Sequence, residues 1–366
     1  MAKRLRLVHI NDIYALEGEQ GTGGYARAST VIDRLRREQV DTACLVIVGG
    51  DFAGGSAVCE WSKGEAAIDI LNVCLSRLKQ FTHCAIGCPR QELQVDMCCL
   101  GNHEFDFGAE HLRDVLMPKS TFEWYGSNVR CADSRELLPG VTHTRMIRVG
   151  DVSVGIFGVV TSATPRMAWP GDSVDFESPK EWATLAAQQL HEQGADVVVA
   201  LTHLRVVQDL EIARVPHVDF VLGGHDHFPH AQEEHGTLVF KTGQNCHYVG
   251  VLDLNFIERV IPLASNNSRY RAVPELRLVP ALGAEDERVL ATIRGWQRKM
   301  EESRADEDAN EVLAVIEGDL PLVTTTSVVR RSESTFGNML ADCMMARFPH
   351  ADCVSSLACC LHACDM

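Results

Sequence analysis

The sequence is poor in several features that would assign a chain to a simple class. No apolar run approaches the length of a membrane-spanning helix, and the opening stretch MAKRLRLVHIND lacks the apolar core of a secretion signal. Basic residues are outnumbered, with 34 Lys and Arg against 50 Asp and Glu and a net charge of −16. That balance argues against an electrostatic grip on a nucleic acid polymer. We therefore expect a cytoplasmic protein that binds neither membranes nor nucleic acids.

The fourteen cysteines lack the order of a disulfide or zinc framework. Some are adjacent, as in Cys98–Cys99, and no Cys-x2-Cys pair occurs. We interpret them as mostly reduced thiols. Cys84 and Cys88 lie close to His83, but a fourth zinc ligand is not evident, and a solvated loop is the simpler interpretation.

Short β-rich runs alternate with helix-patterned stretches through most of the chain. Residues 24–39 carry apolar side chains at helical spacing, and residues 179–193 begin with proline and lead to glycine. This alternation predicts an α/β sheet with helices on its outer faces, and the later hairpin-like strands suggest a mixed or second sheet. The β-rich runs are residues 5–10, 44–50, 95–100, 152–160, 196–202, 218–224, 237–242 and 247–256.

Side chains that can bind metal follow several of these runs. Each segment alone has an ordinary explanation, such as a turn for Gly-Asp or a helix N-cap for Asn-His-Glu. Their joint occurrence after successive apolar runs favours a metal site. Carboxylate, amide and imidazole suit borderline divalent metals, and the set is large enough for two ions. The candidates are His9, Asp12, Tyr14, Asp51, Asn102, His103, Asp106, His203, His225 and His227.

The same segments resemble the calcineurin-like metallophosphoesterases, and among them the branch of 5′-nucleotidases, UDP-sugar hydrolases and 2′,3′-cyclic phosphodiesterases. HINDIY, GGDFAGGS, GNHEFDFG, LTHL and GGHDH match that branch in order over residues 5–256, and residues 333–345 resemble the first helix of its second domain. The resemblance implies a four-layer α/β/β/α sandwich. It also implies hydrolysis of a small phosphate ester or nucleotide by a metal-activated hydroxide.

The resemblance implies a role for each candidate at a site with two divalent ions of Mn, Zn, Fe or Co. His103 would stabilise the phosphoryl group or protonate the leaving oxygen, with its ring fixed by Asp106. Glu104 receives no role and is expected to be structural, and His9 is expected to pack in the core. The implied metal ligands are Asp12 and His227 for the first ion, Asp51 as the bridge, and Asn102, His203 and His225 for the second.

One ligand position departs from the family pattern. The family opens with Asp-x-His, whereas Tyr14 stands at the second ligand position here. A phenol is a poorer ligand than a neutral imidazole unless it is ionised, because its ordinary pKa is near 10. Tyr14 is therefore a doubtful ligand, and the first ion is expected to bind more weakly.

The length between motifs predicts an unusual domain organisation. Residues 1–280 would form the metallophosphoesterase domain, with an insertion expected at residues 75–94. A charged, largely exposed linker helix is expected over residues 281–310. Residues 311–366 would be the truncated start of a 5′-nucleotidase C-terminal domain plus an unrelated tail.

Three hypotheses about function remain open at this point. The first is a metal-dependent phosphoester hydrolase of the 5′-nucleotidase type. The second is a nucleotide-sugar hydrolase or cyclic phosphodiesterase, which would use the same metal residues. The third is a catalytically impaired fragment or binding protein that lacks its substrate domain.

Overall fold

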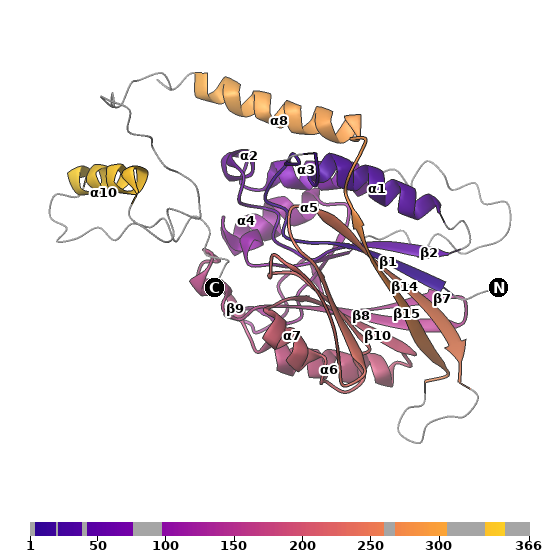
Figure 1. The fold of residues 1–366 in the computed structure, drawn as a ribbon. Helices are drawn as coiled ribbons and strands as arrows, with labels where there is room; N and C mark the ends of the chain where they lie inside the picture. Colours follow the sequence, from indigo (N-terminus) through magenta and orange to yellow (C-terminus); the bar gives the residue numbers. More distant parts are fainter. Residues whose placement is uncertain are drawn as a thin grey trace. The chain divides into compact units, whose positions relative to one another are not determined.

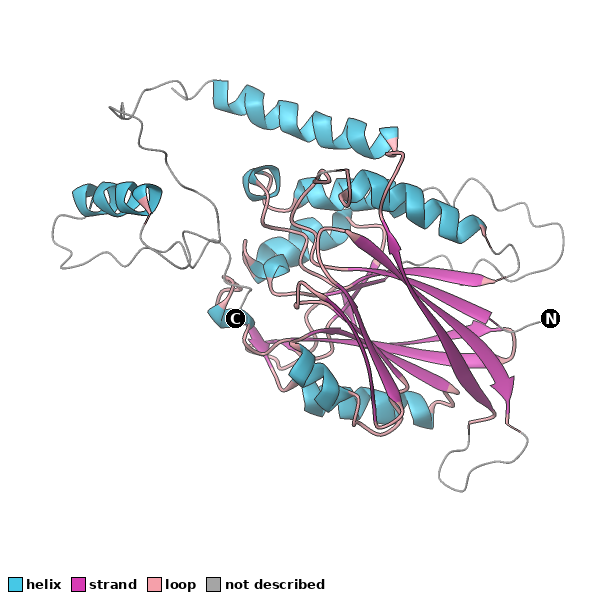
Figure 2. Ribbon diagram, viewed as in Figure 1, coloured by secondary structure: helices cyan, strands magenta, loops and turns pink. Residues whose placement is uncertain are grey.

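The structure is a computed structural model that describes residues 4–19, 21–38, 42–75, 97–259, 268–305 and 334–347. The chain divides into two units, residues 1–301 and residues 302–366. Nearly all of the predicted insertion, from residue 76 onward, lies outside the described residues, as do Cys84, Cys88 and the tail from residue 348. The first unit consists of two packed β-sheets with helices on their outer faces (Figures 1 and 2).

The first sheet has seven strands in the order β15-β14-β1-β2-β3-β4-β6. The strands β1, β2, β3, β4 and β6 are parallel to one another, whereas β14 pairs antiparallel with β1 and β15 pairs antiparallel with β14 at one edge. The carboxyl ends of the parallel strands therefore meet along one edge. The strands are β1 (Arg4–Ile10), β2 (Ala43–Val48), β3 (Met97–Cys99), β4 (Glu123–Tyr125), β6 (Val141–Thr142), β14 (Tyr248–Glu258) and β15 (Tyr270–Pro280).

The second sheet has six strands in the order β12-β13-β11-β10-β8-β7. Its four inner strands are parallel, and β7 and β12 close the two edges as antiparallel partners. A separate antiparallel pair joins β5 (Val129–Cys131) and β9 (Val174–Phe176). The six strands are β7 (Thr144–Val149), β8 (Val152–Val160), β10 (Val197–His203), β11 (Phe220–Gly223), β12 (Pro229–Glu234) and β13 (Thr237–Thr242).

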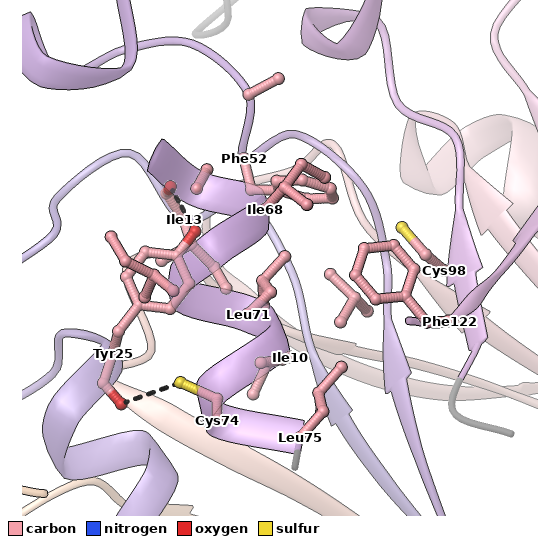
Figure 3. Packing of buried hydrophobic residues seen from close by; sticks show 14 of the residues in the cluster. Ile10, Ile13, Tyr25, Phe52, Ile68, Leu71, Cys74, Leu75, Cys98 and Phe122 are labelled. Carbon is pink, nitrogen blue, oxygen red and sulfur yellow. Dashed lines mark hydrogen bonds between the residues drawn. The ribbon is translucent and has the colours of Figure 1, made fainter. Parts of the chain in front are cut away.

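The alternation of side chains along the strands produces three apolar cores. In β1, Leu5 and Leu7 face the second sheet, whereas Val8 and Ile10 face the helices on the other side. Figure 3 shows Ile10 in this helix-side core with Leu71, Tyr25 and Phe52. A third core packs helices against the outer face of the second sheet. This is the predicted four-layer α/β/β/α sandwich, and the prediction is confirmed.

The two helices predicted from spacing are both present. The helix α6 (Pro179–Glu192) is capped by Ser178, whose hydroxyl accepts from the nitrogen of Glu181 at 3.4 Å, and it buries Ala183, Ala187 and Leu190 along one face. The described helices are α1 (Tyr25–Arg37), α2 (Ala57–Trp61), α3 (Glu65–Leu75), α4 (Ala109–His111), α5 (Met117–Lys119), α6, α7 (Val206–Ile212), α8 (Glu287–Ala305) and α10 (Thr335–Arg347), with short 3₁₀ or π segments at His103–Phe105, Leu112–Leu116 and Thr164–Arg166.

The helix α8 has one buried stripe that the sequence analysis did not predict. Val289 and Ile293 are fully buried in the helix-side core, and the indole of Trp296 donates to Asp69 at 3.2 Å. Most of the other described side chains of α8 are exposed, as expected for a charged helix, and the buried ones form an apolar stripe at helical spacing between the charged residues. The helix α10 covers the segment that resembles a second domain, whose existence stays a prediction.

Two further properties concern the whole described part of the chain. No helix among these residues is both long and apolar enough to cross a membrane. The eight cysteines in the described ranges are free thiols, as expected.

Candidate metal centre

The carboxyl ends of both sheets bring the predicted site residues together. Asp12 follows β1, Asp51 follows β2, and His203 is the last residue of β10. Gly101, just after β3, lies so close to Asp51 that an added Cβ would meet its Oδ1 at 2.2 Å. Only glycine fits at this position, and the next residue is the predicted ligand Asn102.

Three predicted ligands adopt left-handed backbone conformations. Asp12, Asp51 and His225 have φ angles of 53°, 57° and 76°. Such conformations cost about 1–3 kcal/mol each for residues other than glycine, and they cluster at functional sites. Main-chain hydrogen bonds hold two of them in place, from the nitrogen of Asp12 to Gly50 at 3.0 Å and from that of Ile13 to Asp51 at 2.8 Å.

One half of the site is formed by Asp51, His203 and His225, whose ligand atoms all lie within 4.8 Å of one another. His203 Nε2 is 3.0 Å from Asp51 Oδ2. On the other side of the ring, Nδ1 lies 2.7 Å from the carbonyl of Gly49, which directs Nε2 toward the centre.

Asn102 supplies the test of whether this half fits a metal. Its side chain is fully buried, and neither Oδ1 nor Nδ2 has a hydrogen-bond partner among the described residues. His225 Nδ1 is also buried without such a partner. Buried polar atoms are almost always satisfied, and a cation bound beside the amide oxygen and the imidazole would satisfy them. These residues therefore fit a divalent ion.

The other half of the site centres on Tyr14. Its Oη lies 3.2 Å from Asp12 Oδ1, 3.0 Å from Asp51 Oδ2 and 3.2 Å from His227 Nε2. The second oxygen of Asp12 accepts from Asn11 Nδ2 at 2.6 Å and from the nitrogen of His225 at 2.8 Å. These bonds fix the carboxylate so that Oδ1 points toward Tyr14.

His103 lies at the open side of the cluster. Its Nδ1 is 2.7 Å from Asp106 Oδ2, which is the predicted pairing, and its main-chain nitrogen donates to Asp51 Oδ1 at 2.8 Å. The ring keeps 21% of its surface exposed and places Nε2 4.0 Å from Asp51 Oδ2. The imidazole is thus oriented by Asp106 and accessible from solvent.

Glu104 connects two loops of the site, a role that the sequence did not reveal. Its carboxylate is buried and accepts from the main-chain nitrogens of Asp51 at 2.9 Å, Phe52 at 2.9 Å, Ala53 at 3.3 Å and Gly101 at 2.7 Å. Burial and the charge of Asp51 raise the pKa of Glu104 to about 7.

Lys241 is a second residue that the sequence analysis missed. Its buried ammonium lies 2.7 Å from Asp209 and 2.8 Å from Asp226. It also donates to the carbonyls of Leu204 and Gly224, each at 2.6 Å. Burial opposes its charge, but the two carboxylates outweigh burial and raise its pKa. These carbonyls adjoin His203 and His225, so one side chain holds the two loops that carry these predicted ligands.

The charges in the site are strongly coupled. Although burial opposes it, His203 and His103 lower the pKa of Asp51 below its usual range. Burial likewise opposes the charge of His203, yet Asp51 raises its pKa to about 10. Burial and the charge of His203 lower the pKa of His225 to about 4. His9 stays outside this cluster, packed 3.1 Å from the carbonyl of Gly223, as expected.

The sequence comparisons agree with this geometry. Residues 5–229 match the Calcineurin-like phosphoesterase family, so the chain belongs to that family. It is 29% identical over 235 residues to the snake venom 5′-nucleotidase of Naja atra, covering 60% of this chain and 40% of the relative. It is 23% identical to the human 5′-nucleotidase, covering 94% of this chain and 60% of the relative. The chain thus spans less than two-thirds of the length of these relatives.

A solved structure supports the same fold. The 5′-nucleotidase precursor from Thermus thermophilus superposes with a TM-score of 0.69 and 25% sequence identity, over 94% of this chain and 67% of that one. The two-sheet sandwich is therefore a fold that this chain shares with a solved 5′-nucleotidase precursor.

Proposed function

We propose that this chain is a metal-dependent phosphoester hydrolase that acts on nucleotides. The carrying observation is the convergence of Asp51, His203 and His225 beside Asn102, whose buried amide has no partner among the described residues. The proposed ligands are Asp12 and His227 for a first ion, Asp51 as the bridge, and Asn102, His203 and His225 for a second ion.

The chain's own residues divide the work at this site. Two bound ions would lower the pKa of water and neutralise charge on the phosphoryl oxygens. Asp106 holds the His103 ring through Nδ1, so that Nε2 can contact the phosphoryl group or give a proton to the leaving oxygen. Glu104 and Lys241 hold the loops that carry the proposed ligands in place, through hydrogen bonds to their main-chain atoms.

Nucleotides are the proposed substrates because the similar proteins are named 5′-nucleotidases. Nucleotide-sugar and cyclic phosphodiester substrates would use the same metal residues and remain the second candidate. We keep the cytoplasm as the proposed location, on the basis of the free cysteines. A catalytically impaired protein is the competing hypothesis, and it depends on what Tyr14 does.

The test is hydrolysis of AMP and of bis-p-nitrophenyl phosphate by the purified chain with Mn²⁺. Asp51→Asn should lower the rate by roughly 100-fold or more, because several kcal/mol of transition-state stabilisation would be lost. Asp286→Asn is the matched control, since Asp286 is also buried but lies in a separate hydrogen-bond group with Ser29. A folded wild-type chain that binds metal without turnover would support the impaired protein instead.

A further inference from the structure

We propose that two copies of this chain associate through the outer edge of β15, so that the first sheets of both copies join across a two-fold axis. The strand β15 ends the first sheet, and β14 is its only partner among the described strands. Figure 1 shows the two as a long hairpin, and β15 runs for 11 residues. A long edge strand offers a row of main-chain N–H and C=O groups to a further strand. The inference is independent of the proposed function, because β15 carries none of the predicted metal ligands.

The main-chain groups of the even-numbered residues of β15 point away from β14. At the two ends of the hairpin, the nitrogen of Ala281 donates to His247 at 3.0 Å and that of Arg259 donates to Arg269 at 2.9 Å, so odd-numbered residues face β14. The register is continuous between these ends, which keeps this alternation along the whole strand. Pro274 fits the pattern, because proline is tolerated in a strand where its missing N–H would point outward.

These outward groups are complementary to those of a second copy that runs antiparallel and is centred on Leu276. Each Leu276 N–H then donates to the Leu276 carbonyl of the other copy. Each Leu278 N–H donates to the carbonyl of the opposing Pro274, which proline still provides. The two prolines therefore leave the central hydrogen bonds of the joined strands intact.

The charged side chains of β15 select this register among its neighbours. With Leu276 on the axis, Glu275 of each copy lies opposite Arg277 of the other, and opposite charges facing each other stabilise a strand pair. An axis at Glu275 would oppose two glutamates, and an axis at Arg277 would oppose two arginines. The remaining facing pairs in the chosen register are apolar, namely Val273 with Val279 and Pro274 with Leu278.

Within a single copy, Glu275 faces a like charge. It lies directly opposite Asp253 on β14, an arrangement that destabilises a strand pair. Asp253 takes its cations from Arg6 and Arg277, whereas Glu275 accepts only from the amide of Asn255, at 3.0 Å, among the described residues. Arg277 of a second copy would give Glu275 the cation that its own sheet does not supply.

Two apolar side chains of the edge are exposed in the single copy. Val273 and Leu278 keep 36% and 38% of their surfaces exposed. In the joined sheet each lies opposite another apolar residue, Val279 and Pro274 respectively. Removing this apolar surface from water adds to the main-chain bonds and the charge pairs in favouring association.

The experiment is sedimentation velocity of the purified full chain over a range of concentrations, in about 0.15 M salt to screen the net charge of −16. The wild type should show a monomer–dimer equilibrium. Glu275→Arg and Arg277→Glu should each raise the dissociation constant of the dimer by about 10-fold or more, because each creates two like-charge pairs across the axis. The double variant Glu275→Arg/Arg277→Glu restores opposite charges and should return the constant to within about threefold of the wild type.

Arg271→Glu is the matched control, because it reverses a charge on the same strand and face. Residue 271 lies opposite position 281, after the end of β15, so this variant should keep the dissociation constant of the wild type. Glu275→Arg places a cation opposite Asp253, so its melting temperature should not fall and loss of the dimer cannot be ascribed to unfolding.

Four results would overturn the proposal. The first is a wild type that stays monomeric at every concentration. The second is a dimer that both single charge reversals leave unchanged, and the third is a double variant that does not regain the dimer. The fourth is an equal loss in Arg271→Glu, which would mean that the charges do not pair in this register.

Discussion

Glu104 Oε2 accepts hydrogen bonds from the main-chain nitrogens of Asp51, at 2.9 Å, and Gly101, at 2.7 Å. This one carboxylate oxygen therefore joins the loop after β2 to the loop after β3. Asp51, the proposed bridging ligand, and Asn102 belong to these two loops. Their spacing thus depends on a residue that itself need not touch an ion.

Replacing Glu104 with Gln should destabilise the protein by about 2–4 kcal/mol, as measured by urea unfolding. The amide NH₂ would have to face two of the four main-chain N–H groups that Glu104 now accepts from, and buried N–H groups left unpaired cost about 1–3 kcal/mol each. Glu60→Gln is the control, because Glu60 accepts one exposed main-chain bond from Gly55 and should change stability by less than about 0.5 kcal/mol. Equal effects of the two substitutions would contradict the role assigned to Glu104.

Replacing Lys241 with Met should weaken Mn²⁺ binding by about 10- to 100-fold, as measured by calorimetry. Groups that orient metal ligands have effects of this size, and Lys241 holds the carbonyls beside His203 and His225. Stability should fall by about 3–5 kcal/mol as well, because Asp209 and Asp226 lose their cation.

Arg6→Met separates these two effects. Arg6 is a buried cation that pairs with Asp253 through contacts of 2.6 and 2.8 Å, away from the ligand loops. The Arg6→Met variant should lose about as much stability as Lys241→Met and keep the Mn²⁺ affinity of the wild type. If Arg6→Met weakens Mn²⁺ binding as much as Lys241→Met does, the lysine has no specific positioning role. A Lys241→Met/Asp209→Asn variant keeps the comparison possible if the single variant does not fold.

The convergence of the proposed ligand residues was predictable because the position of each one depends on local order along the chain. Asp51, Asn102, His203 and His225 each follow an apolar run, and the carboxyl ends of parallel strands must meet at one edge. Glu104 and Lys241 were not predictable in this way. Their partners lie up to 53 residues away for Glu104 and up to 37 residues away for Lys241, and only the folded chain shows that these side chains face inward.

The distinction between local and long-range contacts also explains which predictions about the helices succeeded. The two helix predictions succeeded because apolar spacing and end signals are local properties of the chain. The burial of α8 depends on its packing against α3 and the first sheet's core, through residues such as Trp296 and Asp69 that are 227 positions apart. The charged residues of α8 correctly predicted its exposed outer face. They gave no indication that the opposite face is buried.

Asp106→Asn should lower kcat by about 10- to 100-fold while the metal content stays unchanged. Asp106 lies 2.7 Å from Nδ1 of His103 and fixes both the ring orientation and its tautomer. An asparagine keeps the shape but removes the charge that stabilises a protonated His103. His103→Ala should reduce kcat further, and combining the two substitutions should add little, because both act through one imidazole. Additive losses, measured by steady-state hydrolysis of AMP, would show that Asp106 acts on its own.

Removing bound metal with a chelator should lower the melting temperature by several degrees. An ion at 100 times its dissociation constant stabilises the folded chain by about 2.7 kcal/mol, because it binds the assembled site and not the unfolded chain. The effect should be large here because Asp12, Asp51 and Asn102 are fully buried, and a cation offsets the charge of the two carboxylates and satisfies the Asn102 amide oxygen, which has no partner among the described residues. Differential scanning calorimetry of the Mn²⁺-loaded and the chelated chain measures this difference in melting temperature.

In Asp51→Asn the difference in melting temperature between the loaded and the chelated protein should largely disappear, because the residue proposed to be shared by both ion positions has lost its charge. A shift of unchanged size in that variant would place the stabilising ion elsewhere in the chain.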